Sequence, residues 1–188
     1  MFNQIRSDFK RHDSSVLNPA LWLILNYRFG NWVLSLRIKP LRWFLSKLYG
    51  FNSFLILITT GDILHRETKI GKNFHIIHPG NIKIHPRSVF GDNCGIQHGV
   101  TLGTNTEREG SPTIGNDVYI GTGAVIIGDI EVGDGARVAA NSLVISNVPQ
   151  NATAIGVPAR MMKYSGRIPL NKKTTENSEK NNTIEQEE

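Results

Sequence analysis

The chain has 188 residues, a formal net charge of +5 and a single cysteine, Cys94. This length fits one domain, or one domain with an appendage, and a lone cysteine excludes an internal disulfide framework. No apolar run reaches the ~18 residues that span a bilayer, and the N-terminus lacks the charged, apolar and small-residue segments of a signal peptide. We therefore expect a cytoplasmic protein.

Residues 1–61 are predicted to form a helical region. Pro19 and Pro40 each open a segment whose apolar residues crowd one side. Residues 1–60 also carry eight Lys or Arg against two Asp. Two interpretations stay open and can coexist. The helices can cap the open end of the domain that follows, or their basic, Trp-rich surface can make peripheral contact with an anionic membrane.

Residues 62–164 repeat every six positions, a period that fits neither a helix nor a simple strand. A strict period of six is typical of a parallel β-helix, in which each hexad supplies one short strand and one turn. The repeat residue is expected to point into the core, and the residue four positions later to fill a corner. The series runs Leu64, Ile70, Ile76, Ile84, Phe90, Ile96, Leu102, Ile114, Ile120, Ile126, Val132, Val138 and Val144. The sequence thus predicts a mainly β fold of about four coils, with 18 residues per coil.

Two irregularities interrupt the series. Residues 80–83 contain a slip of two positions, and residues 103–113 are expected to replace one turn with a protruding polar loop. Loops that leave a rigid solenoid commonly carry function. Residues 165–188, rich in Asn, Lys, Thr, Ser and Glu, are predicted to be a disordered tail. Cys94 falls on a corner position, which favours a small buried thiol over a nucleophile.

Two histidines share one place in the repeat. His78 and His98 are each the third residue of a hexad, and they lie 20 residues apart, one coil plus the slip. We therefore expect them on the same corner of adjacent coils, exposed and close together. A general base needs that placement, and imidazole titrates near neutral pH.

Two other interpretations of these histidines remain. Turn histidines can be ordinary solvated residues, and imidazole is also a common zinc ligand. No Cys or carboxylate completes a tetrahedral ligand set at a suitable spacing, so we expect no metal. No nucleic-acid partner is expected either.

Four phrases of the chain resemble the hexapeptide-repeat, left-handed β-helix acyltransferases, in particular the serine acetyltransferase-like branch. They are residues 99–103 (GVTLG), 114–121 (IGNDVYIG), 128–133 (GDIEVG) and 156–160 (GVPAR). Within that branch, the basic helical lead-in and His98 before the first phrase resemble the colanic acid (exopolysaccharide) acetyltransferases.

This resemblance implies an acetyl-CoA-dependent enzyme that acts as a homotrimer, with active sites between neighbouring β-helices. It places His78 at the catalytic histidine, with His98 beside it. It also implies that coenzyme A contacts Thr122, Ala140, Arg160 and Lys163. A thioester would then be attacked directly by a hydroxyl, since no residue resembles an activated covalent nucleophile.

The chain departs from the serine acetyltransferase pattern at the residues that hold the amino acid. Ile77 stands where that pattern has an Asp, and residues 109–112 (EGSP) replace its Asp-Arg-His-Pro phrase. Asp62 is the nearest candidate for the carboxylate that orients the catalytic histidine, one position from the family's place. We therefore expect the acceptor to be a sugar hydroxyl of a surface glycan, with serine as the alternative. A silent scaffold that only binds partners is the third hypothesis.

Overall fold

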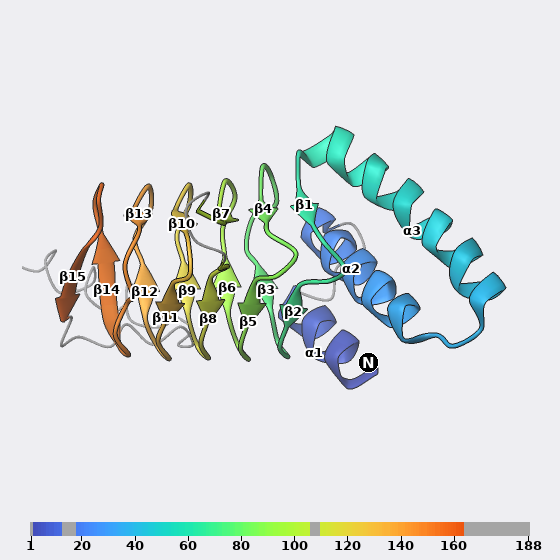
Figure 1. Cartoon of the computed structure of the whole chain (residues 1–188), viewed down its shortest axis with the longest axis horizontal. Helices are drawn as coiled ribbons and strands as arrows, with labels where there is room; N and C mark the ends of the chain where they lie inside the picture. The colour runs from blue at the N-terminus through green and yellow to red at the C-terminus, as the bar shows by residue number, and fades with distance from the viewer. Residues whose placement is uncertain (1, 13–17, 106–109, 164–188) are drawn as a thin grey trace, which may run out of the picture.

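In the computed structural model, residues 2–12, 18–105 and 110–163 are described. Three helices, α1 (Phe2–Arg11), α2 (Pro19–Ser35) and α3 (Lys39–Thr60), lie at one end of a parallel β-helix (Figure 1). The predicted loop tip at residues 106–109 and the predicted tail at residues 165–188 lie outside the described residues.

In the described part of the chain, fifteen short strands form three sheets, which we call sheets A, B and C. Sheet A holds β1 (Ile63–Leu64), β4 (Lys83–Ile84), β7 (Thr101–Gly103), β10 (Val125–Ile127) and β13 (Leu143–Val144). Sheet B holds β2 (Lys69–Ile70), β5 (Val89–Phe90), β8 (Thr113–Ile114) and β11 (Glu131–Val132). Sheet C holds β3 (His75–Ile76), β6 (Gly95–Ile96), β9 (Tyr119–Ile120), β12 (Arg137–Val138), β14 (Ala152–Ile155) and β15 (Arg160–Lys163). The chain visits the sheets in the order A, B, C in each coil, so the predicted parallel β-helix is confirmed.

The residues that the period of six selects form the centre of the β-helix core, which α2 extends with its own buried residues. All thirteen members of the series are buried, from Leu64, which is 8% exposed, to Val144, which is fully buried. Most of the described corner residues four positions on are buried too, including Ala124, Ala136 and Ser142. Several of these residues are small, because the backbone turns there and brings the side chain against the neighbouring coils, whereas Phe74 fills the corner of the first coil with a large ring.

The pairing register shows where the coils are irregular. Thr101 in β7 pairs with Lys83 in β4, 18 residues away, but Ile63 in β1 pairs with Lys83 at 20, which is the two-residue slip. On the other side, Thr101 pairs with Val125 in β10, 24 residues away. Residues 103–113 therefore add six residues to a coil. These added residues lie between β7 and β8, which keep their places in sheets A and B.

Helices α1 and α2 close the open end of the first coil with a buried ion pair. Arg28 of α2 lies 2.9 Å from Asp8 of α1, and both side chains are buried. The Arg28 guanidinium also donates to the carbonyl oxygens of Ile70 (2.7 Å) and Gly71 (2.5 Å), while the Asp8 carboxylate accepts from the amide of Phe74 (3.1 Å). The edge backbone groups that an open solenoid leaves unpaired are thus satisfied by side chains.

Two more polar side chains bind the same edge. The Tyr27 hydroxyl donates to the carbonyl oxygen of Thr68 (2.7 Å) and accepts from the amide of Ile70 (3.2 Å). His12 accepts from the amide of Ile76 through Nε2 (3.1 Å). Packing of α1 and α2 on the first coil is therefore specified by hydrogen bonds as well as by apolar contact.

Helix α3 packs differently. It lies beside α2 and extends away from the β-helix (Figure 1), and none of its described side chains is buried. Gly61, in a left-handed conformation with φ 75°, ends the helix and leads into β1. No helix among the described residues is long and apolar enough to cross a membrane.

Candidate active site

His78 and His98 lie together on one corner of the β-helix, as the spacing predicts. Both side chains are exposed, and their ring centroids are 6.3 Å apart with the ring planes tilted by 53°. Each follows sheet C by two residues, and the strands that precede them, β3 and β6, are adjacent in the register. Their proximity is thus a direct result of the hexad period and the slip.

Glycines with unusual backbone angles hold the two turns in place. Gly80 has φ 133° and Gly99 has φ 71°, both in the region that glycine adopts most readily. The Gly99 amide donates to the carbonyl oxygen of Gly80 (2.7 Å), and the Gly123 amide donates to that of His98 (3.0 Å). A Cβ on Gly80 would lie 3.9 Å from the Cβ of His98, so the His98 side chain leaves the backbone directly beside the slip.

Asp62 binds the backbone of this corner from the buried side. Its side chain is buried, and its Oδ1 accepts hydrogen bonds from the amides of Gly80 (3.0 Å) and Ile82 (2.9 Å). The other oxygen, Oδ2, has no hydrogen-bond partner among the described residues. Asp62 therefore contacts the backbone that follows His78 and makes no hydrogen bond to the His78 ring in the described part of the chain. This geometry favours a positioning role over the predicted direct orientation of the ring.

The corner continues along the β-helix beyond the histidines. Thr122 and Ala140 are third residues of the next two hexads, because β9 and β12 follow β6 in sheet C. The amide of Asn141 donates to the carbonyl oxygen of Thr122 (2.8 Å), which joins these turns as the histidine turns are joined. At about 4.8 Å per coil, Ala140 lies about three coil steps from His78.

The predicted coenzyme A residues divide into two groups. Thr122 and Ala140 lie on the histidine corner, while Arg160 and Lys163 belong to β15, which pairs antiparallel with β14 at the far end of sheet C. Arg160 is exposed. The side chain of Lys163 lies outside what the structure describes.

Gln97 is a candidate that the sequence analysis missed. It precedes His98, and its Oε1 accepts a hydrogen bond from the Thr122 hydroxyl in the next coil. The sequence could have identified Gln97 by its position in the repeat. The second residues of these hexads, which precede the residues of the histidine corner, are Ile77, Gln97, Gly121 and Ala139. Gly121 has a simpler reason to be glycine, since a Cβ there would lie 2.7 Å from the amide nitrogen of Ala140.

The two ends of the inserted loop rest on the β-helix. Gly103 accepts from the amide of Gly128 (3.1 Å), and Ser111 shares a hydrogen bond with Ser88 (2.9 Å). The loop joins sheet A to sheet B, whereas the histidine corner joins sheet C to sheet A. Within one chain, the width of sheet A separates the two features.

Cys94 is buried on its corner, as expected. Its thiol donates to the carbonyl oxygen of Gly115 (3.0 Å), and burial raises the pKa of Cys94 to about 11. Such a thiol is protonated at neutral pH and is a poor nucleophile. Among the residues that the structure describes, no group of three or more His, Cys, Asp or Glu side chains is placed to hold a metal ion.

Residues 111–146 match the family model described as bacterial transferase hexapeptide (six repeats). The match covers the part of the β-helix from β8 to β13, and His78 and His98 precede it. Serine acetyltransferase of Helicobacter pylori strain J99 is 35% identical over 147 residues, which cover 77% of this chain and 82% of that protein. The chain belongs to the hexapeptide-repeat acyltransferases of the serine acetyltransferase type.

Two further comparisons extend over more of the chain. Serine acetyltransferase of Synechococcus elongatus is 29% identical over 179 residues, covering 88% of this chain and 70% of that protein. The crystal structure of serine acetyltransferase in complex with coenzyme A from Brucella abortus strain S19 superposes with a TM-score of 0.72 at 27% identity, covering 88% of this chain and 67% of that one.

These comparisons correct one expectation. The sugar acceptor of a surface glycan is wrong, because the relatives and the solved structure are serine acetyltransferases. Nothing in them supports the closer likeness to the colanic acid acetyltransferases.

Proposed function

We propose that the chain transfers an acetyl group from acetyl-CoA to the hydroxyl of L-serine. The observation that carries this proposal is the exposed His78–His98 pair on a corner that continues past Thr122 and Ala140. The acceptor comes from the names of the relatives, and the donor from the coenzyme A complex of the Brucella enzyme.

His78 acts as the general base in this reaction. It takes the proton from the serine hydroxyl as the oxygen attacks the thioester carbonyl, and a tetrahedral intermediate forms. The C–S bond then breaks, the acetyl group stays on the serine oxygen, and the imidazolium returns the proton to the leaving thiolate. His98 lies close enough to help place the acceptor or to tune His78, since the ring centroids are 6.3 Å apart.

Coenzyme A lies along the same corner. Turns at Thr122 and Ala140 leave the corner free of bulky side chains, which admits a thin pantetheine arm. Arg160 at the far end is exposed and supplies a cation for phosphate. Lys163 follows in β15 and is proposed as a second cation.

The acceptor side has fewer charged groups than the serine acetyltransferase pattern. Ile77 replaces an Asp beside the base, and the Ser111 hydroxyl is hydrogen-bonded to Ser88. Serine's ammonium and carboxylate therefore find fewer partners within one chain. We expect a high KM for serine and a turnover number set by the histidine corner.

The active enzyme is proposed to be a homotrimer in the cytoplasm. A β-helix with three sheets presents three long faces, and closed cyclic symmetry lets each site use two chains. Light scattering at micromolar concentration should give three times the chain mass. A monomer that turns over normally would remove the interchain site.

The test of function is release of free thiol from acetyl-CoA. We expect release with L-serine, stoichiometric O-acetylserine by mass spectrometry, and a low rate without acceptor. His78→Ala should lower the serine-dependent part by about 10²–10⁴. Thiol release that does not depend on L-serine would contradict the proposed acceptor, while leaving the acyltransferase class intact.

A further inference from the structure

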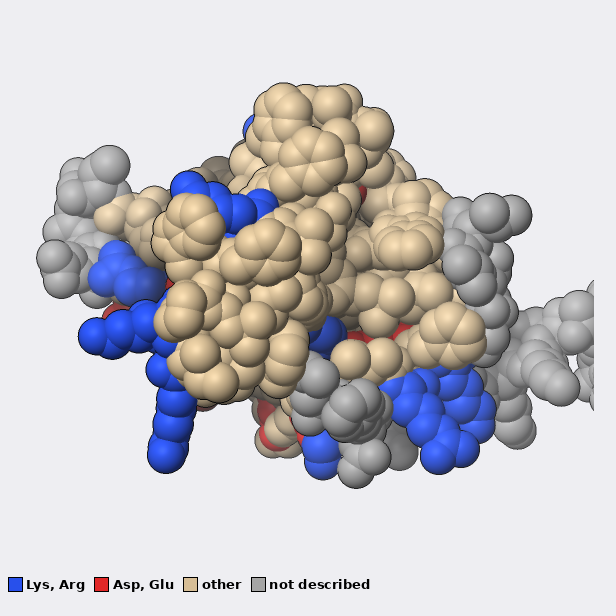
Figure 2. All heavy atoms as spheres, turned by 90° about the vertical axis from the view of Figure 1, so that its right-hand side faces the viewer, with Lys and Arg blue, Asp and Glu red and all other residues tan. Residues whose placement is uncertain are grey.

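The helical end of the molecule carries most of its exposed large apolar side chains. Sixteen described residues are large, hydrophobic and exposed, and twelve of them lie between Trp22 and Ile58. Five of these twelve are at least 60% exposed, namely Ile38, directly before α3, and Trp43, Phe44, Phe51 and Ile58 on α3. Figure 2 views this end directly and shows a broad surface without charge, with Lys and Arg side chains at its margins.

The exposed side chains cover one wide arc of α3. Leu41, Phe44, Leu48, Phe51, Leu55 and Ile58 form a stripe with spacings of three and four, and Trp43, Phe54 and Leu57 lie beside it. At 100° per residue, these positions span about 200° of the helix circumference. The half-buried residues of α3, such as Leu45, Tyr49 and Ile56, occupy the remaining side. The arc is therefore much wider than the narrow seam of a coiled coil.

The charge around this arc has one sign. Between residues 14 and 61 the sequence contains no Asp or Glu, but it contains five Lys or Arg. Arg28 is buried in its ion pair with Asp8, and the other four cations, Arg37, Lys39, Arg42 and Lys47, are exposed. Lys47 is the one of these four cations that lies within the arc, over the ring of Trp43 with Nζ 5.8 Å from the ring centroid, and its long side chain can carry the charge out to the headgroups.

We propose that α3 lies flat on an anionic phospholipid surface, with its apolar arc in the interface and its cations among the headgroups. Aromatic side chains on a wide apolar face, with Lys or Arg nearby, are typical of helices that lie in the interfacial plane. A second copy of the chain fits this surface less well. It would bring the same cations together, and positions beside the stripe offer no carboxylate to pair with them.

The test is flotation of the full-length protein with lipid vesicles. We expect binding to vesicles of phosphatidylcholine and phosphatidylglycerol, weak binding to phosphatidylcholine alone, and release at high salt, because screening removes the charge contribution. Arg42→Gln with Lys47→Gln should lower the partition coefficient about fivefold per cation removed. Phe44→Gln with Phe51→Gln should lower it by at least about tenfold.

Two matched controls test whether vesicle binding depends on the residues of α3 or on any exposed apolar or basic side chain. Ile145→Gln removes an apolar side chain that is 57% exposed on the β-helix, and Arg87→Gln removes an exposed cation there. Both should bind vesicles like the unchanged protein. All variants alter exposed side chains, so far-UV circular dichroism and melting temperature should match.

Three outcomes would overturn the proposal. The first is no binding to anionic vesicles. The second is binding that the α3 variants and the controls reduce equally. The third is a fall in oligomer mass on Phe44→Gln with Phe51→Gln, without vesicle binding, which would assign the arc to a second copy of the chain. Serine-dependent thiol release in solution is measured separately, so the two proposals fail independently.

Discussion

The histidine corner and the helical end are built on different principles. On the corner, each residue is placed by its number in the hexad, and backbone hydrogen bonds between turns repeat from Gly80 to Thr122. At the helical end the period of six is absent, and the polar contacts are individual: Arg28 with Asp8, and Tyr27 with Thr68. Exposed residues of the corner can therefore be substituted without loss of the fold. At the helical end, substitution of a buried polar side chain lowers the stability of the protein.

The largest expected effect is that of removing the proposed general base, His78, from the corner. His78→Ala should lower turnover by about 10²–10⁴, the usual contribution of positioned proton transfer, with little change in acetyl-CoA affinity. His98→Ala should cost less and raise the KM for the acceptor. Steady-state thiol release gives both, and isothermal titration gives the affinity.

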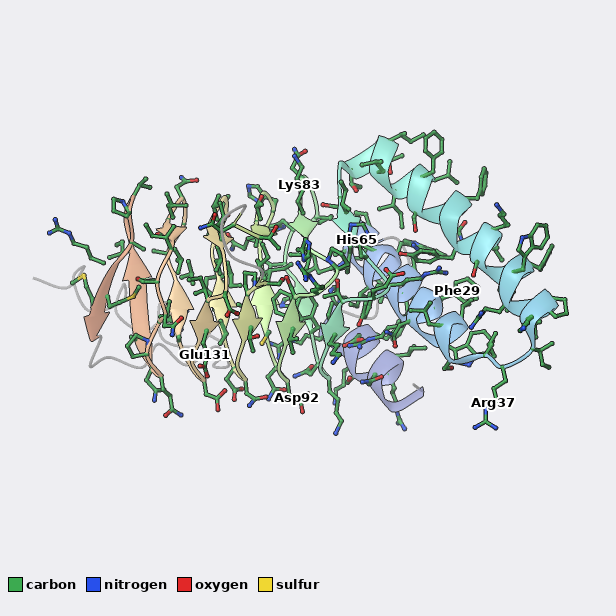
Figure 3. All side chains as sticks on the ribbon, viewed as in Figure 1. Phe29, Arg37, His65, Lys83, Asp92 and Glu131 are labelled. Atoms are coloured by element: carbon green, nitrogen blue, oxygen red, sulfur yellow. The ribbon has the colours of Figure 1, made fainter. Side chains whose placement is uncertain are left out.

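His65→Ala is the matched control for this test. His65 is also exposed on a turn of the β-helix, but it follows β1 on the corner between sheets A and B, and it lies beside the helices (Figure 3). It should keep full turnover. All three variants should melt like the unchanged protein. If His98→Ala abolishes turnover while His78→Ala keeps most of it, the base is misassigned.

Next in size is the effect of breaking the buried ion pair at the helical end. Arg28→Ala leaves the Asp8 carboxyl buried and frees the carbonyl oxygens of Ile70 and Gly71. We expect a loss of about 3–5 kcal/mol in the free energy of unfolding. Arg37→Ala, whose side chain points away from the helices in Figure 3, should cost less than about 0.5 kcal/mol. Urea denaturation measures both.

The loss in Arg28→Ala should also depend on pH. Burial raises the pKa of Asp8 above its ordinary 3.8, while Arg28 opposes that shift. A carboxyl whose folded pKa is raised stabilises the fold fully below 3.8 and loses that contribution as pH rises through the folded pKa. Without Arg28 the pKa of Asp8 rises further. The deficit of the variant should therefore shrink as pH falls toward 4. A deficit independent of pH would show that lost packing dominates.

Asp62 lies where the two regions meet, and its effect should be intermediate. Asp62→Ala removes the acceptor for the Gly80 and Ile82 amides, so we expect a loss of about 2–3 kcal/mol in stability and about tenfold in turnover. Asp62→Asn keeps an oxygen acceptor and should recover most of both. If Asp62→Asn recovers stability but not turnover, the carboxylate charge acts on His78, and the orienting role first predicted is right.

The period of six determined the buried series and brought His78 and His98 together, because coils of fixed length convert sequence spacing directly into position. The same logic could not give the partners of Asp62, since its contact crosses from the helix end to the slip, where the period fails. Nor could it show that α3 has no buried residue while neighbouring α2 has eight. Both helices have an apolar side, and only their placement against the first coil of the β-helix decides which of them is buried.

The smallest expected effect concerns Cys94, a core residue on a regular corner. Cys94→Ala should cost only about 1 kcal/mol at pH 7, because alanine fits the same corner and loses one small buried group. Burial raises the pKa of the Cys94 thiol from 9.0 to about 11, so folding favours the protonated form. That contribution is complete below pH 9 and is lost as pH rises from 9 to 11. The stability difference between the unchanged protein and Cys94→Ala should narrow over this range.

An aromatic disulfide reagent at pH 8 should label the folded protein slowly and the urea-unfolded protein at once. Fast labelling of the folded protein would mean that this corner opens, and the regular coils would then be less rigid than the helical end that caps them.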